Sequence, residues 1–151
     1  MSFHDIREGQ TIDLPGGTSV QNARLNHPSG VLGYRVQHGG RAVVYATDTE
    51  HYAITDPKLA KLAQGADVLI YDATYTPEEY AGKVDGVPRT GWGHSTNEEG
   101  ARIAKELGVK QLVLFHHDPA QNDEAVAEKE RRARTIFPET VAAREGLVIE
   151  L

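Results

Sequence analysis

Five residues whose side chains bind metal ions or move protons fall where a predicted strand gives way to a loop. They are His27, Asp48, Asp72, His94 and His116. Strand ends along one edge of a sheet are where polar groups converge without burying charge in a core. Neutral imidazole nitrogen and carboxylate oxygen suit zinc, manganese or iron, and a carboxylate can bridge two ions. The pattern therefore indicates a metal site, with a solvated rim of the sheet as the alternative.

The first half of the chain must deliver the earliest of these residues, and it has the pattern of antiparallel hairpins. Apolar residues alternate at 10–14 and 19–25 on either side of the turn residues Pro15-Gly16-Gly17, which predicts one hairpin. The same spacing at 31–37 and 41–46, across two glycines, predicts a second hairpin. His27 and Asp48 therefore follow strand ends.

The second half alternates strands and helices. We expect helices at about 57–64, 77–80, 96–107 and 123–137, and strands at 67–71, 111–115 and 147–151. Either Ser95 or Thr96 opens the third helix with a capping box, because Glu98 and Glu99 follow them by three residues. The fold class is therefore α/β (α+β), with β hairpins followed by strand–helix alternation, and we expect residues 1–151 to form a single domain.

Composition limits the partners and the metal ligands. The net charge of −6 argues against extensive binding of nucleic acid, which needs clustered lysine and arginine. Because the chain has no cysteine, any metal must be held by histidine and carboxylate. There is no signal-peptide pattern and no apolar run of membrane-spanning length, so we expect a soluble cytoplasmic protein without a membrane partner.

The other histidines carry weaker signals. A single histidine outside such a cluster is more often a surface or hydrogen-bonding residue than a ligand, which is our interpretation of His4, His38 and His51. His117 follows a candidate ligand but should point to the opposite face of the strand, as a packing or supporting residue.

Several motifs resemble those of the metallo-β-lactamase superfamily, in the ribonuclease Z-like and phosphodiesterase branch. Residues 25–35 (LNHPSGVLGYR) resemble its third metal motif, residues 45–49 (YATDT) its fourth and residues 112–116 (LVLFH) its fifth. Residues 67–74 (DVLIYDAT) and 93–96 (GHST) are similar to the paired acidic and histidine motifs of that branch. The order of the motifs is also that of the family.

The resemblance implies a role for each candidate residue. His27 would bind one metal ion and His116 a second, with Asp48 shared between them. In the family two ions, ~3.5–4 Å apart, activate water and stabilise an in-line displacement at phosphorus. His94 would protonate the leaving alkoxide and Asp72 would orient its ring. Zinc is the expected metal, with manganese or iron as alternatives.

Some neighbours of these residues have less defined roles. Asp118 is a candidate for orienting His116 from outside the metal. Glu50 and His51 are similar to residues of one bacterial subgroup, without an assigned role.

The chain also departs from the family pattern. The family's His-x-His-x-Asp-His run, which supplies four of its metal ligands, is absent. The resemblance therefore covers the C-terminal portion of an αββα sandwich, and each metal would have one terminal ligand and a shared carboxylate. Loss of one sheet would expose the apolar face of the other, so we expect a homodimer in which a second copy covers that face.

Two functions from different classes follow. The first is a metal-dependent phosphodiester hydrolase, active if the missing ligands come from elsewhere, with a small cyclic nucleotide or other phosphodiester favoured over tRNA by the acidic charge. The second is a non-catalytic homodimeric binding or interaction module. A β-lactamase acting on antibiotics is disfavoured because the histidine motif at 93–96 resembles the phosphodiester branch.

Overall fold

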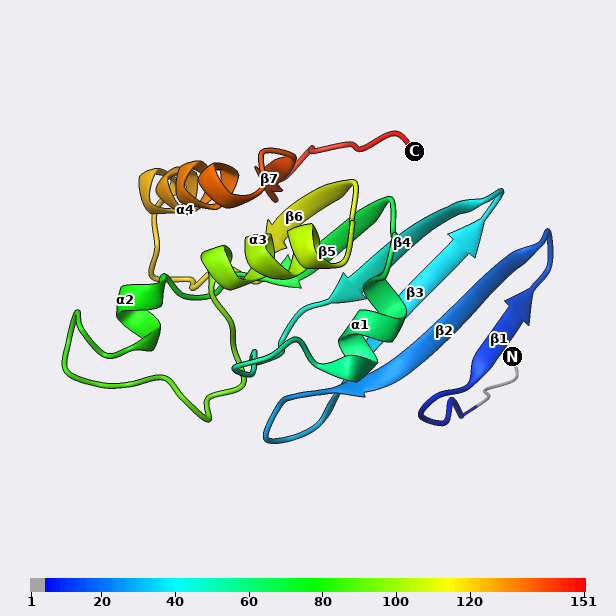
Figure 1. Cartoon of the computed structure of the whole chain (residues 1–151), viewed down its shortest axis with the longest axis horizontal. Helices are drawn as coiled ribbons and strands as arrows, with labels where there is room; N and C mark the ends of the chain where they lie inside the picture. The colour runs from blue at the N-terminus through cyan, green and yellow to red at the C-terminus, as the bar shows by residue number, and fades with distance from the viewer. Residues whose placement is uncertain (1–4) are drawn as a thin grey trace.

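The computed structural model describes residues 5–151 and contains one mixed sheet whose strands follow chain order (Figure 1). The four antiparallel strands are β1 (Thr11–Leu14), β2 (Thr18–Leu25), β3 (Val31–His38) and β4 (Arg41–Ala46). Parallel pairing then continues from β4 through β5 (Val68–Asp72), β6 (Gln111–Phe115) and β7 (Thr140–Ala142). The expected change from hairpins to strand–helix alternation is confirmed.

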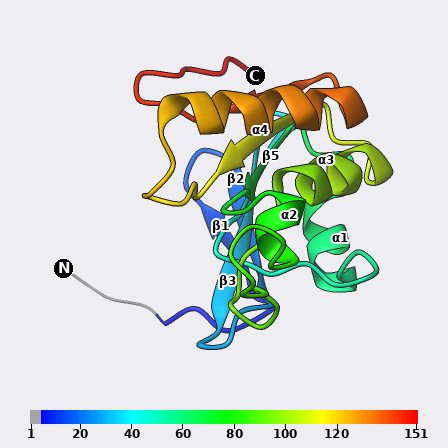
Figure 2. The same cartoon turned by 90° about the vertical axis from the view of Figure 1, so that its left-hand side faces the viewer.

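The helices form the parallel connections, because a parallel neighbour can be reached only by a crossover. They are α1 (Pro57–Ala63), α2 (Pro77–Tyr80), α3 (Asn97–Glu106) and α4 (Asp123–Ile136). Figure 2 shows α1, α2 and α3 on the same side of the sheet. The α4 helix packs against α3 and β7. All but the last of the predicted elements match these to within a few residues.

The core lies between the sheet and this helical layer. Alternate residues of β4, β5 and β6 face it, among them Val44, Leu69 and Leu112, each fully buried. Gly100 allows α3 to approach β5 closely, because a Cβ there would lie 2.9 Å from Cδ1 of Tyr71. This close approach holds the N-terminal end of α3, and the loop before it, against the end of β5.

The opposite face of the sheet is apolar and carries no helix of α1–α3. One cross-strand row runs over five strands through Tyr34, Tyr45, Ile70, Val113 and Val141. Tyr45 is 42% exposed, and its ring packs edge-to-face against Phe115, which is 39% exposed. A stripe of this kind is typical of a surface that another element covers.

The expected final strand at 147–151 is wrong. The strand that pairs with β6 is Thr140–Ala142, and residues 147–151 have no strand pairing. Pro138 ends the preceding segment, and the short run after it reaches the free edge of β6 first. Three residues are too few to show a strand pattern in sequence, whereas 147–151 is an apolar run of strand length that forms no pairing.

The structure decides between Ser95 and Thr96 as the residue that begins α3. Thr96 is the N-cap of α3, and its side chain accepts a hydrogen bond from the amide of Glu99. Ser95 is fully buried and donates its amide to Asp72. The residue before the cap is therefore part of the polar cluster at the strand ends.

Candidate metal centre

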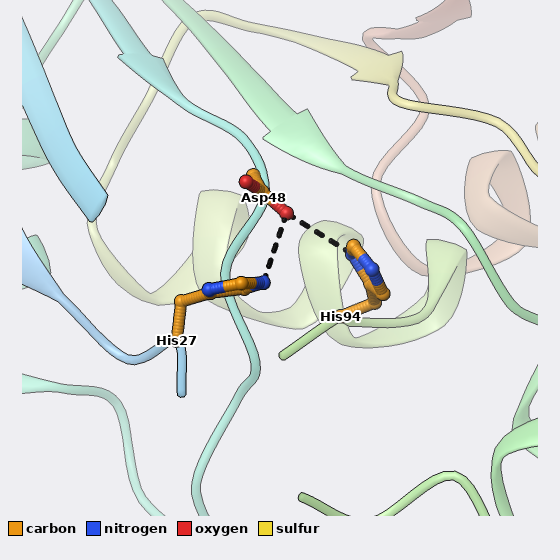
Figure 3. A group of neighbouring side chains, drawn as sticks. All are labelled: His27, Asp48 and His94. Carbon is orange, nitrogen blue, oxygen red and sulfur yellow. Dashed lines mark ion pairs between the residues drawn. The ribbon is translucent and has the colours of Figure 1, made fainter. Parts of the chain in front are cut away.

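Asp48 lies at the centre of a group of imidazoles. Its Oδ1 atom is 3.3 Å from Nε2 of His27, 3.5 Å from Nδ1 of His94 and 4.0 Å from Nε2 of His116. Figure 3 shows the His27 and His94 rings directed at this carboxylate. A single carboxylate oxygen is thus shared by three histidines that come from three separate loops.

Asp72 forms a second, fully buried carboxylate behind this group. Its Oδ1 accepts the amide of Ser95 and both the amide and the hydroxyl of Thr74, at 3.0 Å each. Its Oδ2 lies 3.2 Å from Nδ1 of His94 and 3.6 Å from Nδ1 of His116. The structure therefore brings all five predicted residues together at one edge of the sheet.

Two of the five have an unusual backbone. Within residues 5–151, Asp48 and His116 are the only non-glycine residues with positive φ, at 58° and 56°. The left-handed region costs a side-chain-bearing residue about 1–2 kcal/mol, and such strain concentrates at functional sites. Both strained residues follow the ends of parallel strands, β4 and β6, and both direct a candidate ligand atom into the cluster.

The two outer imidazoles are held in the same way. Ser29 Oγ lies 2.9 Å from Nδ1 of His27, and Thr74 Oγ1 lies 3.2 Å from Nδ1 of His116. A hydroxyl therefore occupies Nδ1 in each ring while Nε2 faces Asp48. A partner on the far nitrogen that orients the ring is what histidine ligands of metals ordinarily have.

His94 differs from these two because the hydrogen-bond partner of its Nδ1 atom is a carboxylate, Asp72 at 3.2 Å, and not a hydroxyl. Its hydrogen bond to Asp72 raises the pKa of His94 above the ordinary value, as does the charge of Asp48, although burial opposes the shift. The proton is therefore held more tightly than on a free imidazole. This environment suits an acid beside a metal site better than a ligand, which must be deprotonated.

Glu50 is a part of the site to which the sequence assigned no role. It is 7% exposed, and its carboxylate accepts hydrogen bonds from the Tyr80 hydroxyl at 2.6 Å and the amides of Gly91 and Gly93 at 2.8 and 3.0 Å. Burial would raise the pKa of Glu50, but these hydrogen bonds outweigh it and lower the pKa. Glu50 thus joins the loop after Asp48 to the loop before His94.

The buried Lys129 supports the loop after β5. Its ammonium group donates to the carbonyl oxygens of Ala73 and Thr74, at 2.5 and 3.3 Å. Burial lowers the pKa of Lys129 to about 8. A lysine in the middle of a charged helix gives no sequence signal for such a role.

The remaining histidines have varied environments, and His4 lies outside the described residues. His38 is hydrogen-bonded to the Thr18 hydroxyl at 2.9 Å, as a surface residue would be. His51 Nδ1 lies 3.0 Å from Ser95 Oγ and so borders the site. Within residues 5–151, both ring nitrogens of His117 are buried without a hydrogen-bond partner, and burial lowers the pKa of His117 to about 4.

Asp118 does not contact His116 in the way the sequence suggested. Its Oδ1 accepts the amide of Ala120 at 2.8 Å, which closes the loop after β6. Thr74 occupies Nδ1 of His116 instead. The orienting partner comes from the neighbouring strand, because parallel strands end side by side.

The donor set fits a metal ion in type and arrangement. One nitrogen or oxygen from each of His27, Asp48 and His94 lies within 4.8 Å of the others, and the same holds for Asp72, His94 and His116. Asp48 is 40% exposed and His116 is 39% exposed, so the ligand atoms open to one side. With His94 kept as an acid, however, each ion would have one imidazole and the shared Asp48, short of the three protein ligands of a catalytic zinc.

Comparison with known proteins identifies the lineage. The family model described as the beta-lactamase superfamily domain matches residues 1–117. The chain belongs to the metallo-β-lactamase superfamily. Ribonuclease Z of Bacteroides fragilis is 34% identical over 146 residues, which are 97% of this chain and 41% of that protein. The ribonuclease Z-like branch and the hydrolase lineage that the motifs indicated are thus confirmed.

Solved structures confirm the fold of this superfamily. The metallo-β-lactamase fold protein YhfI from Bacillus subtilis aligns with a TM-score of 0.74 at 22% identity, over 94% of this chain and 52% of that one. Zn²⁺-bound PqqB from Methylobacterium extorquens aligns with a TM-score of 0.69 at 20% identity, over 97% of this chain and 55% of that one. One structural neighbour of this chain is therefore a zinc-bound protein.

The superfamily match is partial in length. The chain spans about two fifths of ribonuclease Z from Bacteroides fragilis, at 41% of that protein. Among residues 5–151, no helix is both long and apolar enough to cross a membrane.

Proposed function

We propose that this chain is part of a metal-dependent phosphodiester hydrolase with a dinuclear centre. His27 and Asp48 would hold one ion, and His116 and Asp48 would hold the other. The observation that carries the proposal is the position of Asp48 Oδ1, within 4.0 Å of three imidazoles. The strained backbone at Asp48 and His116 supports the same assignment, because a packed fold retains such conformations mainly where they are used.

The residues of the chain divide the chemistry between them. Bound metal ions supply Lewis-acid activation of water and neutralise charge on the phosphoryl oxygens. His94 donates its proton to the leaving alkoxide. General-acid catalysis of this kind contributes roughly 10²–10⁴-fold to the rate. Asp72 keeps His94 protonated and aims its ring, through the 3.2 Å contact to Nδ1. Glu50 holds the loop that carries His94 in register with Asp48.

The remaining ligands must come from outside the residues described. The metal is zinc in this proposal, with manganese or iron as alternatives that the same donors accept. The net charge of −6 favours a small phosphodiester or cyclic nucleotide over tRNA. Residues 1–151 act as a single domain, and the protein is cytoplasmic.

A second copy of the chain covers the apolar face of the sheet in this proposal. The row through Tyr34, Tyr45 and Ile70 is continuous across strands, and Tyr45 and Phe115 are each about two fifths exposed, at 42% and 39%. Two such faces packed together bury apolar area in the manner of a sheet-on-sheet core. We therefore propose that two copies of the chain form a homodimer through this face.

Metal binding and turnover test the enzyme. The 151-residue protein is loaded with Zn²⁺ or Mn²⁺, its metal content is measured, and hydrolysis of bis(p-nitrophenyl) phosphate is followed. We expect Asp48→Ala to lose metal and activity, and His94→Ala to keep metal while losing roughly 10²–10⁴-fold in turnover. His38→Ala is the matched control, because the His38 ring is hydrogen-bonded to the Thr18 hydroxyl and lies outside the site.

A non-catalytic binding module is the second candidate, favoured by the shortage of ligands. A protein that retains no metal and shows no turnover under added zinc or manganese would support the module and contradict the enzyme. Equal loss of activity in His38→Ala and His94→Ala would contradict the role of His94.

A further inference from the structure

A series of cation–π and edge-to-face contacts leads from the surface of the protein to His94. The guanidinium of Arg89 lies 4.7 Å from the ring centroid of Trp92 and 5.9 Å from that of Tyr75. The Tyr75 ring in turn packs edge-to-face against His94, with centroids 6.0 Å apart. Tyr75 is buried, whereas Trp92 is 50% exposed. The exposed end of this series of contacts is therefore Trp92.

The loop holds this tryptophan in place from several sides. Arg89 pairs with Asp85 and donates to the carbonyl of Val87, so its guanidinium has a fixed position. The amide of Trp92 donates to the carbonyl of Arg89 at 3.0 Å. Glu50 accepts the amides of Gly91 and Gly93, on either side of Trp92. A large exposed ring on a backbone pinned this tightly is preorganised for contact with a ligand.

The position of Trp92 relates it to the candidate catalytic residues. It is two residues from His94, so the two Cα atoms are at most about 7.6 Å apart. Gly93, between them, lies against His27, since a Cβ on Gly93 would be 2.2 Å from Cδ2 of that ring. Arg89 contacts both the Trp92 and the Tyr75 ring, and the Tyr75 ring contacts His94, so the indole is joined by side-chain contacts to the candidate acid.

We propose that Trp92 is a stacking platform for a nucleobase of the substrate. This rests on the proposed phosphodiester hydrolysis and specifies its substrate as a nucleotide or nucleotidyl ester. A nucleobase is planar and has a π-face, which stacks on an aromatic side chain without regard to sequence. Arg89 covers one face of the indole, so the base stacks on the opposite face. An aliphatic phosphodiester has no group that uses this surface.

The fluorescence of Trp92 tests the proposal directly, because the chain contains a single tryptophan. The zinc-loaded protein is titrated with adenosine 5′-monophosphate and, separately, with ribose 5-phosphate, which has the same sugar and phosphate but no base. Excitation is set beyond the adenine absorption band. We expect saturable quenching by the nucleotide alone. Equal responses to both compounds, or no response to the nucleotide, would overturn the proposal.

Variants measured by calorimetry separate stacking from general damage. We expect Trp92→Leu to weaken nucleotide binding roughly 5- to 150-fold, the range that stacking of one base supplies. Val84→Ala changes another exposed residue of the same loop, 67% exposed, and should leave binding unchanged. Unchanged affinity in Trp92→Leu would overturn the proposal.

The two proposals fail in different ways. Turnover of bis(p-nitrophenyl) phosphate without nucleotide quenching would retain the hydrolase and overturn the platform. Nucleotide quenching in a protein whose metal content is unchanged by Asp48→Ala would retain the platform and overturn the proposed metal centre of the hydrolase. Indole emission that shifts to the blue with protein concentration, and ignores the nucleotide, would mean that Trp92 contacts another chain and would overturn the platform.

Discussion

At the scale of single residues, the site depends on a few atoms held in uncommon conformations. Asp48 and His116 both have left-handed backbones; Asp48 supplies the shared carboxylate oxygen Oδ1, and His116 places its Nε2 atom 4.0 Å from that oxygen. Hydroxyl groups on Ser29 and Thr74 occupy the far nitrogens of His27 and His116. Contacts within the protein therefore hold these side chains, at a local cost in backbone strain that the surrounding packing offsets.

The contact between Gly93 and His27 leads to a prediction at this scale. Gly93 and Gly91 both have positive φ, at 91° and 84°, but only at Gly93 does a Cβ meet another residue, His27 at 2.2 Å. We expect Gly93→Ala to lower the affinity for Zn²⁺ roughly 10- to 100-fold, as displaced supporting contacts do. Gly91→Ala carries the same backbone penalty and should leave the affinity unchanged. Chelator competition measures both, and equal effects would contradict the prediction.

At the scale of elements, the site exists because four strands run in the same direction. The β2 and β4 strands are each antiparallel to β3, and β4, β5 and β6 are parallel, so β2, β4, β5 and β6 all end at one edge. Asp72 is the last residue of β5, and the loops after β2, β4 and β6 carry His27, Asp48 and His116. The α3 helix then places His94 beside them, because Ser95 and Thr96 bind the end of β5 and cap the helix.

The α4 helix contributes to this edge through Lys129, which leads to a prediction on pH. Burial lowers the pKa of Lys129 from 10.5 to about 8, against the nearby charges of Glu79, Asp72 and Asp118. Between these values the unfolded chain binds more protons than the folded chain, so the free energy of unfolding rises with pH. We expect this contribution, on the order of 3 kcal/mol over the whole interval, to be absent in Lys129→Met.

Denaturant unfolding of both proteins from pH 7.5 to 10.5 tests this expectation. The quantity compared is the difference in the free energy of unfolding between wild type and Lys129→Met. Tyrosines also titrate near pH 10.5, but their contribution is the same in both proteins and cancels in this difference. The free energy of unfolding of the wild type should rise with pH relative to that of Lys129→Met. A difference that stays constant across the interval would mean that Lys129 is not held in a charge-penalising environment.

At the scale of the whole molecule, helices cover one face of the sheet, whereas apolar side chains are exposed on the other. Helices cover the face that contains Val44, Leu69 and Leu112, whereas Tyr45 and Phe115 remain exposed on the other. The alignments cover only about half of the chains that share the fold, 52% of YhfI for instance.

Association through this face is a prediction for the molecule as a whole. We expect the 151-residue chain to be a dimer in light scattering at micromolar concentration, and Tyr45→Glu to dissociate it, because a charge at the centre of an apolar interface is costly to bury. Tyr52→Glu changes a tyrosine of similar exposure, 48% against 42%, in a loop rather than the sheet, and should remain dimeric. A monomeric wild-type chain would contradict the expectation.

The sequence alone predicted most of the elements and the candidate residues. Alternation at 31–37, glycine and proline turns, and the apolar run at 111–115 are local signals, and they correctly indicated strands and their ends. His27, Asp48, Asp72 and His116 were found because each lies at the end of such a run, and the resemblance to the family motifs supplied their roles. The expectation that His94 also follows a strand is wrong, because it lies in the loop before α3. The strand at 147–151 was wrong because pairing with β6 depends on which segment reaches its free edge first.

What the sequence by itself determined is therefore the order of elements and the identity of the residues at one edge of the sheet. Only the tertiary structure decided that Asp48 Oδ1 faces three imidazoles, that Glu50 joins two loops, and that Thr74 rather than Asp118 orients His116. The reason is physical: periodicity and turn chemistry act between near neighbours in the chain. Hydrogen bonds between strand ends depend on register and packing between segments that the sequence separates widely.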